Sequence, residues 1–164
     1  MTESQPDLHL RPMRADELAA FRESFIRDWA ADLARIDDVP AAEALRQAAQ
    51  RTDAELSAGV ATRGHHLFVL VAGDEAVGTA WLSVTATGEA FLDDLTVHAP
   101  HRGQGYGKRA LELLEQHARA LGLRCIDLHV YAHNPRALAL YQRQGYQTTG
   151  LKLRKRLAGA TTTR

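Results

Sequence analysis

The feature that most constrains this chain is a glycine-rich turn that joins an extended apolar segment to an amphipathic helix, within FLDDLTVHAPHRGQGYGKRALELLEQHARAL, Phe91 to Leu121. Gly103, Gly105 and Gly107 lack a Cβ atom, so the backbone there can adopt positive φ and come close to a ligand. The helix that begins among them directs unpaired N–H groups and its positive dipole end toward the turn. Arg102 adds a forked cation. The pattern therefore predicts a binding site for a pyrophosphate.

Two common phosphate-binding loops do not fit this spacing. A P-loop would need a glycine at position 102 and a hydroxyl residue at position 109, where the chain has Arg102 and Arg109. A dinucleotide fingerprint would need a small residue where Lys108 stands, and the segment from His98 to Arg102 separates the strand from the first glycine. Asp127 lies at the distance expected of a ribose-binding acid, but its place in the pattern is the middle of a strand.

A third pattern, Arg/Gln-x-x-Gly-x-Gly/Ala, is met by Arg102, Gly105 and Gly107 and is the coenzyme A signature. LTV and Pro100 precede it, and NPRALALYQRQGY follows it. In this order of motifs the segment from Phe91 to Tyr146 resembles the GNAT superfamily of acetyl-CoA-dependent N-acetyltransferases, and the resemblance extends more weakly over nearly the whole chain. It implies an α/β fold with a mixed, mostly antiparallel central sheet, helices on both faces, and a V-shaped splay between two parallel strands.

The resemblance also implies how acetyl-CoA would bind. Acetyl-pantetheine would lie in the splay between residues 93–97 and residues 125–130. The backbones of Leu95 and Val97 would pair with its amides, and the Val97 N–H could polarise the thioester carbonyl. The cofactor-binding residues implied in this way are Leu95, Thr96, Val97, Arg102, Gly103, Gln104, Gly105, Tyr106, Gly107, Lys108, Asn134, Ala137 and Tyr141.

Three side chains are candidates for the proton transfers. Tyr141 matches the family tyrosine that hydrogen-bonds the coenzyme sulfur and can act as general acid. Asp93 and Asp94 are the candidate bases. Strand alternation is expected to put their side chains on opposite faces, so at most one faces the splay directly; Asp94 is favoured, and a chain of water molecules is the alternative. Asn134 matches the family asparagine beside the pantetheine arm, and it also suits the cap of a helix whose first turn holds Pro135.

Periodicity and turn residues predict the remaining elements. A strand over Leu8 to Met13 precedes two helices, one from Asp16 through Ile36 and one from Pro40 toward Gly59. Three extended segments then form an antiparallel meander, and a helix from about Gly105 to Leu121 follows the glycine-rich turn. Later elements are a strand at 123–130, a helix at 134–144 and a strand or hairpin at 146–157. The inward face of the helix after the turn is expected to comprise Ala110, Leu113, Leu114, His117 and Leu121.

Charge is balanced over the whole chain but clustered locally. Twenty basic and twenty acidic side chains leave no net field that would favour nucleic acid or an anionic membrane. Basic side chains alternate with leucines near the end of the chain, where they are expected to protect an edge strand, or else to bind an acidic partner or the ribose phosphate of the cofactor: Lys152, Arg154 and Arg156. Acidic side chains on the first helices could wall an acceptor site or simply face solvent: Glu23, Asp28, Asp32, Asp37 and Asp38.

Composition predicts one soluble domain. A chain of 164 residues with 45% apolar and 24% charged residues suits a single domain over residues 1–164, with a disordered tail at about 158–164. No apolar run approaches the roughly 20 residues of a membrane span, and no signal-peptide pattern is apparent, so we expect a cytoplasmic protein. Cys125, the single cysteine, is expected to be buried and inert.

The histidines do not form a metal-binding pattern. His129 with His133, and His98 with His101, lack the cysteines or carboxylates that would complete a ligand set, so no metal is expected.

The sequence thus predicts an N-acetyltransferase that moves an acetyl group from acetyl-CoA directly to a primary amine on a small molecule, peptide or protein. Neither nucleic acid nor membrane is an expected partner, and a homodimer is left open. The alternative is a non-catalytic module that binds coenzyme A or an acyl-CoA; a nucleotide-binding domain is a third option, to be separated by ligand protection.

Overall fold

The computed structural model describes residues 7–157, so the predicted tail at 158–164 lies outside the described part. A five-stranded sheet has the order β1-β2-β3-β4-β5. Neighbours among the first four strands are antiparallel, whereas β5 runs parallel to β4. The mixed, mostly antiparallel sheet implied by the sequence is therefore confirmed. The strands are β1 (His9–Pro12), β2 (His65–Ala72), β3 (Glu75–Val84), β4 (Ala90–Val97) and β5 (Ile126–Leu128).

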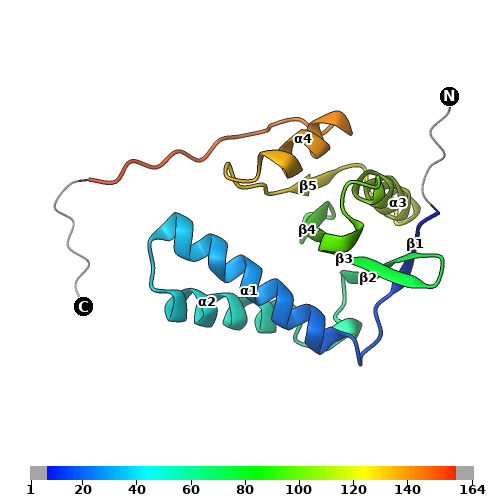
Figure 1. Ribbon diagram of the computed structural model, residues 1–164, viewed down its shortest axis with the longest axis horizontal. Helices are drawn as coiled ribbons and strands as arrows, with labels where there is room; N and C mark the ends of the chain where they lie inside the picture. The colour runs from blue at the N-terminus through cyan, green and yellow to red at the C-terminus, as the bar shows by residue number, and fades with distance from the viewer. Residues whose placement is uncertain (1–6, 158–164) are drawn as a thin grey trace.

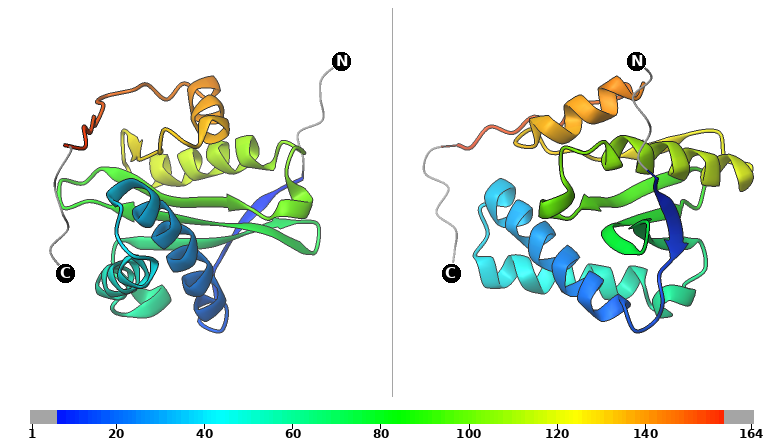
Figure 2. Two further views of the ribbon diagram at one scale, coloured as in Figure 1. Left: turned by 60° about the vertical axis from the view of Figure 1, so that its left-hand side comes forward. Right: turned by 45° about the vertical axis from the view of Figure 1, so that its right-hand side comes forward.

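Helices cover both faces of the sheet (Figures 1 and 2). One pair lies on one face and consists of α1 (Leu18–Asp37) and α2 (Ala41–Glu55). The other face is covered by α3 (Tyr106–Ala120), with α4 (Pro135–Arg143) beside it. Short 3-10 turns precede β2 and α3, at Gly59–Ala61 and Ala99–His101.

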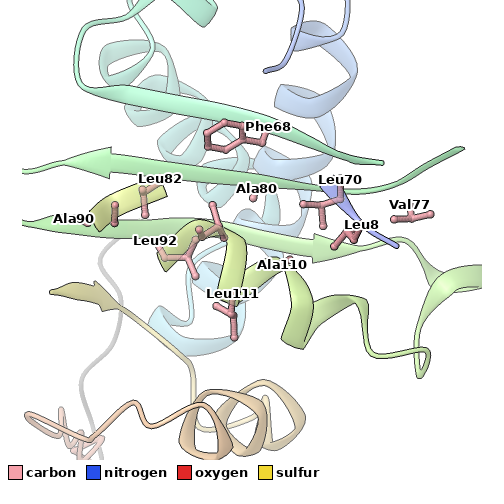
Figure 3. Packing of buried hydrophobic residues seen from close by; sticks show 12 residues of the cluster. Leu8, Phe68, Leu70, Val77, Ala80, Leu82, Ala90, Leu92, Ala110 and Leu111 are labelled. Atoms are coloured by element: carbon pink, nitrogen blue, oxygen red, sulfur yellow. The ribbon is translucent and has the colours of Figure 1, made fainter. Parts of the chain in front are cut away.

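Alternation along the strands fills a separate apolar layer on each face. In β3, Leu82 packs toward α3 together with Leu92 and Leu111 (Figure 3). The preceding residue of β3, Trp81, points to the other face of the sheet. There its side chain is fully buried and meets the ring of Phe25 edge-on at a centroid distance of 5.1 Å. Burying large apolar side chains on both faces stabilises the sheet and holds β4 between two rigid layers.

The inward face of α3 differs in part from the predicted one. Ala110 and Leu114 are buried as expected, but Leu111 and Ala118 are buried as well, and Leu121 is 43% exposed. Leu121 lies just beyond the last helical residue, so it does not continue the stripe toward the sheet. Sequence periodicity permits several adjacent stripes on a helix, and contact with the sheet selects one of them.

The last part of the chain departs most from expectation. β5 is only three residues long, instead of the eight predicted from 123 to 130, and Cys125, predicted to be buried, is exposed. Residues 146–157 form neither a strand nor a hairpin. The predicted edge strand is therefore wrong: Arg154 instead donates a hydrogen bond to the carbonyl oxygen of Ile36 at 2.5 Å, at the end of α1.

Candidate active site

The glycine-rich turn has the backbone that a phosphate site requires. Gly103 and Gly105 adopt φ values of 80° and 83°, a region that other residues rarely enter. Gly105 occupies the N-cap of α3, which begins at Tyr106 without a side-chain cap. The first N–H groups of α3 therefore lack intrahelical acceptors and point toward the exposed turn. The positive end of the helix dipole lies at the same place, so an anion would be stabilised there.

Arg102 links this turn to the end of β4. Its Nε donates a hydrogen bond to the Val97 carbonyl oxygen at 2.9 Å. The bond uses only one of the guanidinium nitrogens, and no Nη contact is found within residues 7–157. Gln104 donates from Nε2 to the Pro100 carbonyl oxygen at 3.3 Å and ties the turn to the preceding 3-10 segment. Gly107 packs against α4, because a Cβ there would lie 3.1 Å from Leu140 Cδ2.

The two parallel strands separate beside this turn. β4 pairs with β5 only from Ala90 to Leu92 and then continues alone on that side to Val97. The His98 N–H bonds to the Val77 carbonyl oxygen at 2.8 Å on the β3 side. Since backbone groups alternate along an antiparallel strand, the N–H and C=O of Leu95 and Val97 face the opposite, open side. The chain thus has the predicted splay, lined by strand backbone that no strand pairs with; the Val97 carbonyl oxygen there accepts the Arg102 Nε hydrogen bond.

A β-bulge in β4 changes the expected direction of one aspartate. Trp81 pairs with Asp94 and the next β3 residue, Leu82, pairs with Leu92, so Asp93 has no partner opposite it. Leu92 and Leu95 both pack against the α3-side cluster, and the two residues between them therefore turn to the other face. The expectation that Asp93 and Asp94 lie on opposite faces is wrong, because it assumed unbroken alternation.

Both carboxyl groups bind a proton more tightly than an exposed aspartate does. Burial is the main cause for Asp94 and raises its pKa to about 6, although hydroxyl donors oppose the shift. Thr96 Oγ1 donates to Asp94 Oδ1 at 3.0 Å, and Thr79 Oγ1 donates to Asp94 Oδ2 at 3.3 Å. Burial likewise raises the pKa of Asp93 to about 7, and its Oδ2 is buried without a partner among the described residues. A carboxylate with an elevated proton affinity is suited to act as a general base near neutral pH.

Tyr141 approaches the splay from the other layer. It lies on α4, whose cap is the predicted Asn134, since the Asn134 Oδ1 accepts the N–H of Ala137 at 3.2 Å. Burial, and secondarily the charge of Asp94, raise the pKa of Tyr141 to about 12. The hydroxyl therefore stays protonated at neutral pH and remains a proton donor. Asp94 and Tyr141 are thus near enough to influence each other electrostatically, although they come from different elements.

With this geometry in place, the family assignment follows from comparison. The acetyltransferase (GNAT) family matches residues 18–146. The chain belongs to this family. Its similarity to YycN of Bacillus subtilis, named an uncharacterized N-acetyltransferase, is 40% identity over 106 residues, covering 62% of this chain and 68% of YycN. YdgE of the same organism, also named an uncharacterized N-acetyltransferase, is 30% identical over 153 residues, covering 90% and 97%.

The crystal structure of YycN from Bacillus subtilis superposes with a TM-score of 0.86 at 32% identity, over 92% of this chain and 98% of that one. The protein is thus a GNAT N-acetyltransferase, as the motif order predicts, and its family uses acetyl-CoA. Within residues 7–157 no group of three or more potential ligands could hold a metal, and no helix is long and apolar enough to cross a membrane.

One contact between distant elements was not predicted. His133, in the segment after β5, places Nε2 2.6 Å from the Asp32 carboxylate on α1. Tyr131 stacks on His133 with ring centroids 5.5 Å apart. The Asp32 contact joins α1 to the segment that follows β5. The two bonded residues are 101 positions apart, so no local sequence pattern could have revealed them.

Proposed function

We propose that this GNAT enzyme transfers an acetyl group from acetyl-CoA directly to a primary amine in the splay between β4 and β5. One observation carries the proposal: the end of β4 that β5 does not pair runs from two half-buried aspartates to the glycine-rich turn, and Tyr141 on α4 packs against the same apolar cluster as Leu95 and Val97. Bound acetyl-CoA would supply an acetyl thioester, which is an activated acyl donor. All further steps are those of the protein's own groups.

Binding would use backbone more than side chains. The turn at Gly103 and Gly105, the first N–H groups of α3 and the nearby Arg102 suit the negative charge of a pyrophosphate. The set assigned to this end of the molecule comprises Arg102, Gly103, Gln104, Gly105, Tyr106, Gly107 and Lys108. The exposed backbone edge at Leu95 and Val97 suits an extended chain with amide groups, which can add to the edge as a strand does.

The proton transfers would be divided between two groups. Asp94 would accept a proton from the acceptor ammonium, leaving a neutral amine whose lone pair can form the new C–N bond. The Val97 N–H would stabilise negative charge that develops on the carbonyl oxygen. Tyr141 would donate its hydroxyl proton to the sulfur as the C–S bond breaks, and the second proton that the nitrogen loses as the amide forms would return to the tyrosinate oxygen. Both groups have the required protonation states above about pH 6, because Asp94 is then ionised and Tyr141 is not.

The acceptor is proposed to be cationic. The exposed Asp28 and the half-buried Asp32 lie on α1, and the charge of Asp28 reaches Asp94 strongly enough to raise its pKa further. An amine that arrives as an ammonium ion would be attracted to this end of the site. Polyamines, amino sugars, amino acids and peptide amino termini would all satisfy this requirement, so they form the substrate panel.

The test uses Tyr141→Phe, with Tyr146→Phe as a matched control, since the two rings are neighbours at a centroid distance of 5.7 Å. Tyr141→Phe should leave the Kd of coenzyme A within about twofold and lower kcat by about 10- to 1000-fold. Tyr146→Phe should lower neither. Equal losses of affinity and turnover in Tyr141→Phe, or equal losses of turnover in both variants, would contradict the assignment.

A non-catalytic coenzyme A module is the second candidate. The glycine-rich turn and the splay would be enough to bind coenzyme A even if the protein catalysed no reaction. Thermal unfolding with saturating acetyl-CoA, against ATP and NAD as controls, tests binding, because a ligand specific for the folded state raises Tm. Release of free thiol with the amine panel tests turnover. A selective Tm increase without thiol release from any amine would favour the module.

A further inference from the structure

Lysine is scarce in this chain, whereas arginine is abundant. Seventeen of the twenty basic side chains are arginines, and the three lysines are Lys108, Lys152 and Lys155. A guanidinium keeps its proton in proteins, whereas a lysine amine becomes a nucleophile when it loses one. Lys108 belongs to the glycine-rich turn. The other two lysines lie close together in the last described segment, residues 147–157, here named the carboxyl-terminal arm.

Both lysines of the arm are accessible amines. Every residue of the arm is exposed, and neither Lys152 nor Lys155 makes an ion pair or a hydrogen bond within residues 7–157. The arm forms no helix or strand that would have to unfold before one of these side chains could change position. An amine-acetylating enzyme therefore has two unpartnered amines on its own most irregular segment.

Arginines fasten the arm to the end of α1. Arg154 donates to the Ile36 carbonyl oxygen at 2.5 Å and pairs with the Asp37 carboxylate, and Arg156 lies 3.2 Å from a carboxylate oxygen of Asp38. Figure 1 shows the arm leaving α4 and running past this end of α1. Two arginines that are two positions apart reach the same helix end, as alternate residues of an extended chain do.

This alternation distinguishes the two lysines. Lys152 precedes Arg154 by two positions, so we expect it on the side of the arm that faces α1, whereas Lys155 belongs to the opposite side. Gln147 and Thr149, earlier in the arm, line a groove beside β5. Lys152 therefore lies between β5 and the end of α1.

One face of α1 leads from the arm to the proposed base. Asp28, Asp32 and Ile36 are spaced four residues apart and so lie along the same side of the helix. Burial, and after it the charge of Asp28, raise the pKa of Asp94, which indicates that Asp28 is close to that carboxyl. Asp32, one turn further, holds His133 in the segment after β5.

The distance along this face is within reach of Lys152. The eight residues from Asp28 to Ile36 span about 12 Å of helix. Two residues of extended chain, from Arg154 back to Lys152, cover about 6.6 Å. The four-carbon stem of the lysine extends further still. Only the arm has to shift, and its contacts with α1 keep Lys152 at a high local concentration beside the site.

We propose that the enzyme acetylates its own Lys152, which makes this side chain a modification site and an acceptor carried by the chain itself. The inference rests on the proposed function, because it uses the same thioester and the same proton-transfer groups. A cationic lysine also has the charge that the acidic face of α1 attracts. Lys155, on the opposite side of the arm, is not modified.

The bonds and protons balance as in the reaction with a free amine. Asp94 accepts one proton from the Lys152 ammonium, and the Nζ lone pair forms the new C–N bond with the acetyl carbon. As the C–S bond breaks, the sulfur takes the proton of the Tyr141 hydroxyl, and the second proton from the nitrogen returns to the tyrosinate oxygen. The products are acetyl-lysine, the free thiol of coenzyme A and a proton that Asp94 releases to water.

The test incubates the full-length protein with acetyl-CoA and no added amine, and then maps the products by trypsin digestion and mass spectrometry. Trypsin does not cut after an acetylated lysine, so modified Lys152 is found in the uncut peptide QGYQTTGLKLR, residues 144–154. Lys152 should be acetylated at least about tenfold faster than Lys155, because only Lys152 is held beside the site. Lys152→Arg should abolish the thiol release that accompanies modification, and Lys155→Arg, the matched control, should retain it.

Asp94→Asn separates enzymatic from chemical acetylation. This variant should lower the rate of Lys152 acetylation by about 100- to 10,000-fold, because the base is lost, and should leave any slow reaction of Lys155 unchanged. Equal rates at the two lysines would mean that acetyl-CoA modifies exposed amines unaided, and would overturn the proposal. An undiminished rate at Lys152 in Asp94→Asn would overturn it as well.

Two further measurements complete the test. The rate of Lys152 acetylation per subunit should not change on dilution of the protein, whereas a rate proportional to protein concentration would place the lysine in the site of another copy and refute the arrangement within one subunit. Thiol release with the amine panel is followed in the same preparation. Turnover of an added amine without acetylation of Lys152 would refute this inference alone, and absence of both would refute the proposed function with it.

Discussion

Replacing Asp94 by asparagine should make the protein more stable and less active at the same time. The side chain is half-buried, and its desolvation raises the carboxyl pKa from 3.8 to about 6. A raised carboxyl pKa means that the folded state binds the proton more tightly than the unfolded state, so stability decreases as pH rises from about 4 to about 6 and then stays low. Asparagine removes this charge without changing the size of the side chain.

The magnitude follows from the shift. About two pKa units at about 1.36 kcal/mol each correspond to about 3 kcal/mol at pH 8, as an upper value. Asparagine can accept a hydrogen bond on one oxygen only, whereas Asp94 accepts from both Thr79 and Thr96. The net gain is therefore expected to be about 1–3 kcal/mol. Turnover should decrease by about 100- to 10,000-fold, because the proposed base is lost.

Urea unfolding of both proteins at pH 8 and pH 4, at one protein concentration, measures the gain. It should be large at pH 8 and mostly absent at pH 4, where the aspartate is protonated in the folded state and partly protonated in the unfolded state. Asp74→Asn, in the exposed turn before β3, is the control and should change stability by less than about 0.5 kcal/mol. An equal gain at both pH values would refute charge burial as its source, and unchanged turnover would exclude Asp94 as the base.

Three further substitutions test other parts of the structure. Gly78→Ala should destabilise the sheet by at least about 1–3 kcal/mol in urea unfolding, because its Cβ would lie 2.2 Å from the Thr96 carbonyl oxygen. Burial lowers the pKa values of His66 and His117, whose ring nitrogens are 3.2 Å apart, so stability should decrease as pH falls below about 6.5. His117→Phe should weaken this dependence of the unfolding free energy on pH, and an unchanged dependence would refute histidine burial as its cause. Asn134→Ala should lower Tm by removing a cap worth about 1 kcal/mol, and Asn134→Asp should largely restore it.

Local sequence was sufficient for the features that depend on a few neighbouring residues. Glycines at 103 and 105 predicted a turn of positive φ before a helix, and the structure has it. The Asn134-Pro135 pair predicted a capped helix start, which is also present. Alternation predicted the three strands of the meander. Each of these follows from the geometry of a single turn, helix face or strand, so the information lies within a short window.

The contacts between distant segments could not be obtained in this way. The bulge at Asp93 depends on the register between β3 and β4. The extra residue in β4 changes the face of the sheet toward which the Asp93 side chain points. The contact between Asp32 and His133 depends on how α1 crosses the sheet. Cys125 is exposed because no strand among residues 7–157 pairs with the outer edge of β5.

The sequence by itself therefore determined the order of the elements and the chemical character of the glycine-rich turn, since both arise from backbone preferences of adjacent residues. Only the tertiary structure decided that both aspartates of β4 face α1 and α2, and that residues 147–157 do not join the sheet. These outcomes depend on strand register and on packing between layers, where residues far apart in the chain compete for the same space.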